Sequence, residues 1–160
     1  MMERRPWDRL RSALRRDAPA KEPHSLDGLT VEGAREWADR HGLTVEADQA
    51  DLLGVTGTDD GLGRVEARWA LDSAAVAAIE VTVRSPHPSP PPELAAFLLE
   101  PLAAALPEPD RSALDTWARG QLAHRGPYNA ATTLSAMQLA IAIEDGDGPN
   151  RTWTLTARAR

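Results

Sequence analysis

The chain has 160 residues, of which 42% are hydrophobic and 26% are charged, with a net charge of −6 and no cysteine. This length suits one domain with a true core, and no apolar run approaches the roughly 20 residues of an integral membrane segment. The acidic balance disfavours nucleic-acid binding, and the lack of cysteine excludes disulfides and thiolate chemistry. Lys21 is the one lysine among 18 basic residues, a bacterial-like composition typical of a GC-rich genome.

Residues 1–25 predict a basic amphipathic helix followed by a linker. Three apolar side chains recur at helical spacing within residues 3–17, where six arginines outnumber three acidic residues. Such a helix could dock on a partner, make a weak contact with an anionic membrane surface, or fold back onto its own domain. The side chains expected to make the contact are Trp7, Leu10, Arg11, Leu14 and Arg15.

Residues 26–160 predict a single α+β domain, which begins with a helix over residues 30–41. Thr30 can cap this helix, and Gly42 can end it. His41 lies in the last turn, where a cation suits the helix dipole. This placement explains the histidine without a catalytic role.

Residues 43–85 predict three strands. The first lies within residues 52–58, where two glycines interrupt the pattern. The second and third alternate apolar and polar side chains over residues 64–71 and 77–84. Together they predict a hairpin with one buried face.

A proline tract over residues 86–92 ends the last of these strands and predicts an extended connector. Two helices are expected after it, over residues 92–106 and 109–124, because apolar side chains recur there at helical spacing. Pro101 cannot donate a helical hydrogen bond, so it should kink or split the first of the two.

Two alternating runs, over residues 137–143 and 153–157, predict a C-terminal hairpin that also buries one face. If both hairpins share a sheet, their apolar sides form one continuous floor for the helices. The fold we expect is α+β, a mostly antiparallel sheet of about five strands with helices packed on one face. The expected order of elements is α-α-β-β-β-α-α-β-β.

This order resembles the secretion-chaperone-like arrangement of type III secretion chaperones. The resemblance covers roughly residues 28–160, rests on element order and carries no motif residues. The chain is expected to end on a strand, where that arrangement supplies another helix. The resemblance implies antiparallel strands and flanking helices that bind peptide segments or form dimers.

No residue is assigned as catalytic, cofactor-binding or metal-binding. The four histidines lack the spacing of metal ligands. Glycines within residues 54–63 could form a phosphate loop, but Asp59 and Asp60 would repel an anion, so a hairpin turn explains them better. Asp145 and Asp147 could bind a hard cation weakly, although such residues are also typical of tight turns. We expect no cofactor.

We expect a cytoplasmic, non-catalytic interaction module, chaperone-like or adaptor-like, that binds a protein or peptide partner. Small neutral side chains on the outer sheet face would leave a flat surface for a partner, and a homodimer could form through that face or an edge strand. The residues expected on this surface are Ala140, Ala142, Thr154 and Thr156. The alternative is a small enzyme or small-ligand carrier with a site between helices and sheet. That alternative requires a deep pocket with at least two convergent polar side chains.

Overall fold

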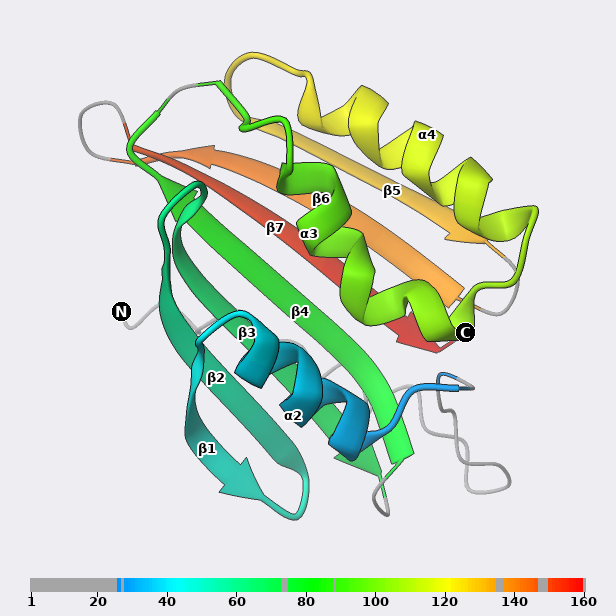
Figure 1. Ribbon diagram of the computed structural model, residues 1–160. Coiled ribbons are helices and arrows are strands. Elements are labelled where there is room, and N and C mark those ends of the chain that lie inside the picture. Colours follow the sequence, from blue (N-terminus) through cyan, green and yellow to red (C-terminus); the bar gives the residue numbers. More distant parts are fainter. Residues whose placement is uncertain are drawn as a thin grey trace, which may run out of the picture.

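Seven strands form one antiparallel sheet in the part of the chain that the structure describes (Figure 1). The computed structural model describes residue 26 and residues 28–72, 75–87, 89–134, 137–146 and 150–159. The strands lie in the order β1-β2-β3-β4-β7-β6-β5, so two meanders converge on β4 from opposite edges. The strand bounds are β1 Thr44–Gln49, β2 Leu52–Asp59, β3 Gly63–Asp72, β4 Ala75–Ser85, β5 Tyr128–Leu134, β6 Met137–Asp145 and β7 Arg151–Ala159.

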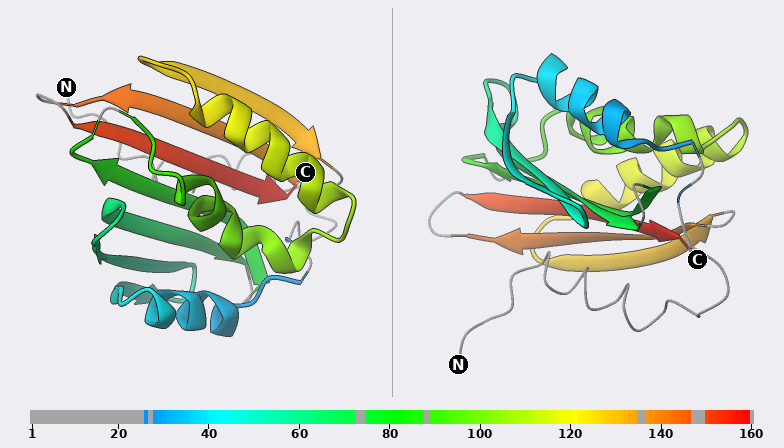
Figure 2. Two further views of the ribbon diagram at one scale, coloured as in Figure 1. Left: turned by 45° about the horizontal axis from the view of Figure 1, so that its top comes forward. Right: turned by 90° about the horizontal axis from the view of Figure 1, so that it is seen from below.

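Within the described ranges, three α-helices and one 3-10 helix lie on a single face of the sheet (Figure 2). Their bounds are α2 Val31–Arg40, α3 Leu94–Leu99, η1 Glu100–Ala105 and α4 Asp110–Leu122. α2 covers the first meander, α4 lies over β5 and β6, and α3 with η1 lies between them (Figure 1). None of these helices combines the length and apolar character that crossing a membrane requires.

The expected count of about five strands was wrong, because the sheet has seven. Residues 43–85 form four strands, since β1 precedes the glycine-containing β2. Residues 128–134 form β5, where the sequence pattern predicted only a connection into the C-terminal hairpin. Both missed strands are edges of the sheet. β1 is exposed at almost every position, and β5 buries its side chains only partly, so neither shows a strong apolar alternation.

The helices follow their sequence signals more closely. The Thr30 side chain accepts a hydrogen bond from the Gly33 backbone N–H at 3.0 Å, which confirms the predicted cap of α2. α3 ends at Leu99 and the chain continues as a 3-10 helix through Pro101, so the predicted split is confirmed. α4 matches the last predicted helix.

The helix-covered face of the sheet carries the core. Val83 of β4 lies directly opposite Trp153 of β7, which joins the two predicted hairpins in one sheet. Trp69 and Trp153 are only 2% and 0% exposed. Trp69 meets Trp37 of α2 edge-on, with ring centroids 5.7 Å apart. The predicted shared apolar floor is therefore confirmed.

Candidate functional site

The sheet face opposite the helices brings the predicted interaction residues together. We call it the open face, because no described helix lies over it (Figure 2). Ala140 of β6 is directly opposite Thr156 of β7, and Ala142 is directly opposite Thr154. All four side chains are half-buried. Strand pairing thus makes one small, neutral patch from two separate stretches of sequence.

A shallow cavity of about 470 Å³ lies on the open face over β5, β6 and β7. Ala140 and Thr156 line it, together with Gln138 and Arg158. Arg158 donates through Nε to Oε1 of Gln138 at 2.7 Å, so these two long side chains lie against each other at the border of the patch. The centre of the patch carries methyl and hydroxyl groups, and its border carries an amide and a guanidinium group.

The open face has a different character over β3 and β4. Ala70 and Ala78 are 1% and 0% exposed, and they form a small cluster apart from the main core. Beside them, Arg68 lies directly opposite Glu80, whose side chain is largely buried. This half of the face carries charged side chains and is buried around Ala70 and Ala78, whereas the half over β5 to β7 is mostly neutral and hollowed. The predicted residues belong to the neutral half.

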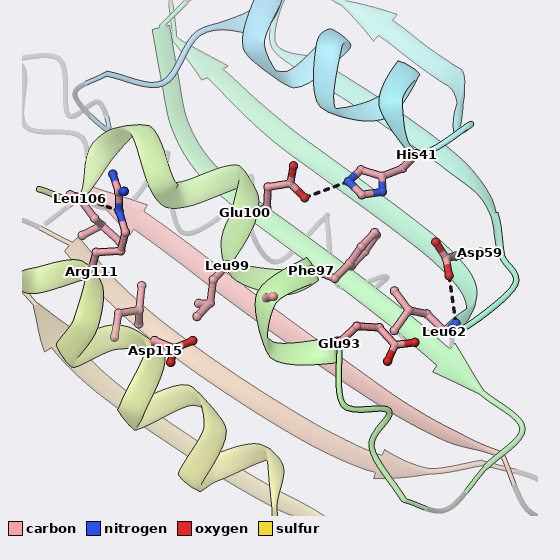
Figure 3. Close-up of a pocket in the computed structure, with 12 residues that line it drawn as sticks. His41, Asp59, Leu62, Glu93, Phe97, Leu99, Glu100, Leu106, Arg111 and Asp115 are labelled. Atoms are coloured by element: carbon pink, nitrogen blue, oxygen red, sulfur yellow. Dashed lines mark hydrogen bonds and ion pairs between the residues drawn. The ribbon is translucent and has the colours of Figure 1, made fainter. Parts of the chain in front are cut away.

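A second cavity, of about 530 Å³, surrounds α3 on the helix-covered side (Figure 3). We call it the α3 groove. His41, Asp59 and Glu93 lie on the flank toward α2, and Arg111 and Asp115 lie on the flank toward α4 (Figure 3). Its apolar lining is formed by Leu62, Ala96, Phe97, Leu99, Leu106 and Leu114.

Glu100 joins the end of α2 to the start of η1. Its Oε2 lies 2.9 Å from Nε2 of His41, and its Oε1 lies 3.2 Å from the Arg40 guanidinium. The His41 ring also packs against Trp37 and Phe97, with centroids 5.1 and 4.9 Å away. These contacts hold α2 against η1, so they account for the histidine and the carboxylate structurally. No local pattern in the sequence indicates this pair, because its members are 59 residues apart.

Asp59 organises the turn between β2 and β3. Its Oδ1 accepts hydrogen bonds from the backbone N–H groups of Gly61 and Leu62, at 2.9 and 3.1 Å. An added Cβ at Gly61 would lie 2.5 Å from Oε1 of Glu93, so this glutamate side chain would have to move aside. The hairpin turn predicted for this glycine-rich stretch is confirmed. The Asp59 carboxylate already accepts hydrogen bonds from backbone N–H groups that a phosphate loop would use to bind an anion.

The remaining charged groups of the α3 groove are also mostly paired. Asp115 accepts from Nε of Arg119 at 2.9 Å, and Arg111 donates through Nε to the Leu106 carbonyl at 3.1 Å. Glu93 is the exception: its backbone carbonyl accepts from the Phe97 N–H, but its side chain forms no hydrogen bond or ion pair with the described residues. In those residues, no group of three or more histidine or carboxylate side chains is arranged to hold a metal ion.

Several sequence predictions concern residues that the structure does not describe. The predicted contacts of the N-terminal helix all precede residue 26, and they stay predictions: Trp7, Leu10, Arg11, Leu14 and Arg15. Asp147 of the last turn is likewise outside the described ranges. Its neighbour Asp145 forms an ion pair with the Arg151 guanidinium at 3.0 Å, which joins the ends of β6 and β7.

Comparison with known proteins finds no matching family model, no matching curated protein and no matching solved structure. Proposals about function therefore rest on the chain's own geometry.

Proposed function

We propose that the protein is a non-catalytic interaction module, chaperone-like or adaptor-like, that binds a protein or peptide partner on the open face. One observation carries this proposal: helices cover the seven-stranded sheet on one side, while small neutral side chains gather on the other. A broad, shallow surface of this kind suits a contact with another chain, whereas small molecules are usually bound in enclosed, concave sites.

The chemistry of the patch suggests what the partner presents. Ala140 and Ala142 leave room above the sheet for larger apolar side chains of a partner segment. Thr154 and Thr156 can donate or accept hydrogen bonds, and Arg158 at the border suits an acidic group. In this proposal, the basic amphipathic segment of residues 3–17 provides a second contact for the same partner.

Two substitutions, one on the open face and one in the α3 groove, test where the partner binds. Ala142→Arg places a long cation in the middle of the open face, and Ala96→Arg places the same side chain at an exposed position in the α3 groove. Affinity capture from the native host should recover a partner with the wild type and Ala96→Arg but not with Ala142→Arg. A partner lost only with Ala96→Arg would contradict the proposal, as would one retained by both variants.

The α3 groove supports a second candidate function, as a small enzyme or small-ligand carrier. Its volume of about 530 Å³ lies within the range of small-molecule sites, and it combines an apolar lining with several polar side chains. Asp59, Glu93, Glu100 and Asp115 make its rim acidic, so the fitting ligand is partly apolar and carries a cation. Stabilisation by cationic amphiphiles in thermal unfolding would support this function if Ala96→Arg removed it and Ala142→Arg did not.

A further inference from the structure

The two edges of the sheet are protected differently against pairing with another strand. β1 carries Glu46 and Asp48 at exposed positions. Its register with β2 also shifts between Val45 and Ala47. Charged side chains and bulges are common means of preventing edge-to-edge pairing, because both disturb the ladder that a new strand would join.

β5 lacks both forms of protection. Its seven residues, Tyr128–Leu134, contain no charged side chain. They pair with β6 in an unbroken register from Tyr128 opposite Ile143 to Leu134 opposite Met137. No described strand lies on the outer side of β5. Its outward backbone groups therefore form a regular template for a further strand.

The flank of α4 that adjoins this edge is rich in small and aromatic residues. On the helical period, Ala113, Trp117 and Gly120 fall on the other side of α4 from Arg111 and Asp115, which line the α3 groove. Trp117 is half-buried and packs against the edge of the core. An added Cβ at Gly120 would meet no atom within 4 Å. A second helix could therefore approach this flank closely.

An aromatic pair connects α4 to the beginning of β5. The rings of His124 and Tyr128 are stacked, with centroids 3.5 Å apart and planes 8° apart. The Tyr128 hydroxyl also donates to Oε1 of Gln121 at 2.9 Å. Trp117 precedes this pair by two turns of helix, so three aromatic rings belong to the end of the chain segment that leads into an uncharged strand. Aromatic side chains of this kind are enriched at the centres of protein interfaces.

We propose that two copies of this chain form a homodimer in which β5 pairs antiparallel with β5 of the second copy. A two-fold axis at Ala131 places this residue opposite its own copy and Tyr128 opposite Leu134 of the second copy. No like charges meet along the seven residues, so the strand is complementary to itself. The inference goes beyond the proposed function, since it needs no other partner.

The spacing of the helices agrees with this arrangement. α4 lies over β5 and β6, and neighbouring strands are about 4.8 Å apart. Continuing the sheet across the two-fold axis would therefore bring the axes of the two α4 helices to about 10 Å, the usual distance of packed helices. The helix pair would add side-chain contacts to the backbone pairing of the strands.

The same axis passes close to the middle of α4. Ala131 is about 10 Å along β5 from Tyr128, at roughly 3.3 Å per strand residue. His124 stacks on Tyr128, so it marks the same level at the end of α4. Along the helix, a length of about 10 Å corresponds to about seven residues at roughly 1.5 Å each, and counting seven residues back from His124 reaches Trp117. Antiparallel helices crossing at Trp117 would place Asp110 level with His124 of the second copy, next to Arg125, which follows the end of α4. Opposite charges would then meet at both ends of the helix pair.

A charge exchange at Ala131 tests the dimer. This side chain is exposed and also lines the open-face cavity, so the readout is the oligomeric state and not partner capture. Ala131→Glu and Ala131→Lys should fold normally, and circular dichroism will check that they do. The wild type should be dimeric by sedimentation equilibrium. Each variant alone should have a dissociation constant raised by about tenfold or more, because like charges would meet on the axis. An equimolar mixture of the two variants should form a heterodimer.

Two controls separate this edge from other surfaces. Val45→Glu puts the same charge on the exposed edge strand β1, and Ala142→Arg changes the open face one strand away from β5. Both should remain dimeric. A monomeric wild type would overturn the inference, and so would a dimer that survives in both Ala131 variants or a mixture that fails to associate. Loss of a partner on Ala142→Arg with an intact dimer would show that the two proposals stand or fall separately.

Discussion

The two faces of the sheet come from the same strands but bury very different side chains. On β7, Trp153 and Leu155 point into the core and are at most 2% exposed. Thr154 and Thr156 alternate with them and are half-buried on the open face. Because successive side chains of a strand point to opposite faces, one strand can stabilise the fold on one side and offer contacts on the other.

The polar groups of the two sides differ as well. Under the helices, Glu100 bridges Arg40 and His41, and Asp115 pairs with Arg119. These polar side chains of the α3 groove have partners that explain their presence. On the neutral half of the open face, the polar side chains make uncharged or single-cation contacts between strands: the Thr82 and Thr154 hydroxyls lie 3.3 Å apart, and Arg158 donates to Gln138. The small, uncharged centre of this half is the reason why the proposed contact is placed there.

The largest expected difference between the two faces is the one between Trp153→Ala, on the core face, and Thr154→Ala, on the open face. Removing the fully buried indole should lower the free energy of unfolding by about 3 to 5 kcal/mol, because it leaves a cavity in the core. Trp69→Ala should act similarly. Thr154→Ala removes only the 3.3 Å contact of its hydroxyl with that of Thr82, so it should lower the free energy of unfolding by no more than about 1 kcal/mol. Urea denaturation measures both, and an unchanged stability of Trp153→Ala would mean that the buried face is wrongly assigned.

A smaller effect is expected where the open face is itself tightly packed. Ala78 is 0% exposed, so Ala78→Leu should destabilise the protein by about 1 to 3 kcal/mol through overpacking. The matched change Ala142→Leu, in the neutral half, should be nearly neutral. Equal unfolding midpoints for the two variants would show that the two halves of the open face do not differ in packing.

The polar link between α2 and η1 should contribute less. Glu100→Gln weakens the contacts to Arg40 and His41, which are partly exposed, so we expect a loss of about 0.5 to 1.5 kcal/mol in chemical denaturation. Glu93→Gln is the control, since Glu93 has no such partner in the described part of the chain. A similar loss in both variants would show that the link does not hold the helices.

The smallest effect is expected from deleting residues 1–20. The described residues form one large core cluster, in which the helices pack on the sheet and the two meanders meet at β4. The truncated protein should retain a single cooperative thermal transition. If cooperativity is lost, the basic segment belongs to the core rather than to a contact surface.

The sequence predicted those elements that carry strong local signals. The cap at Thr30, the helix break at Pro101 and the alternation of the two central hairpins each depend on neighbouring residues alone. β1 and β5 were missed, because an edge strand pairs on one side and need not bury an apolar face. The grouping of Ala140 with Thr156 was foreseen, since alternation assigns each residue to a face.

The α3 groove and the order of the strands could not be foreseen. His41 and Glu100 are in contact although 59 residues separate them in the sequence, and no local pattern predicts such a contact. The side-chain pattern alone determined which face of each central strand is apolar, because that depends on the geometry of a single strand. Only the packing of helices on the sheet decided which distant side chains share a cavity and which strands are left as edges, because those relations arise between elements.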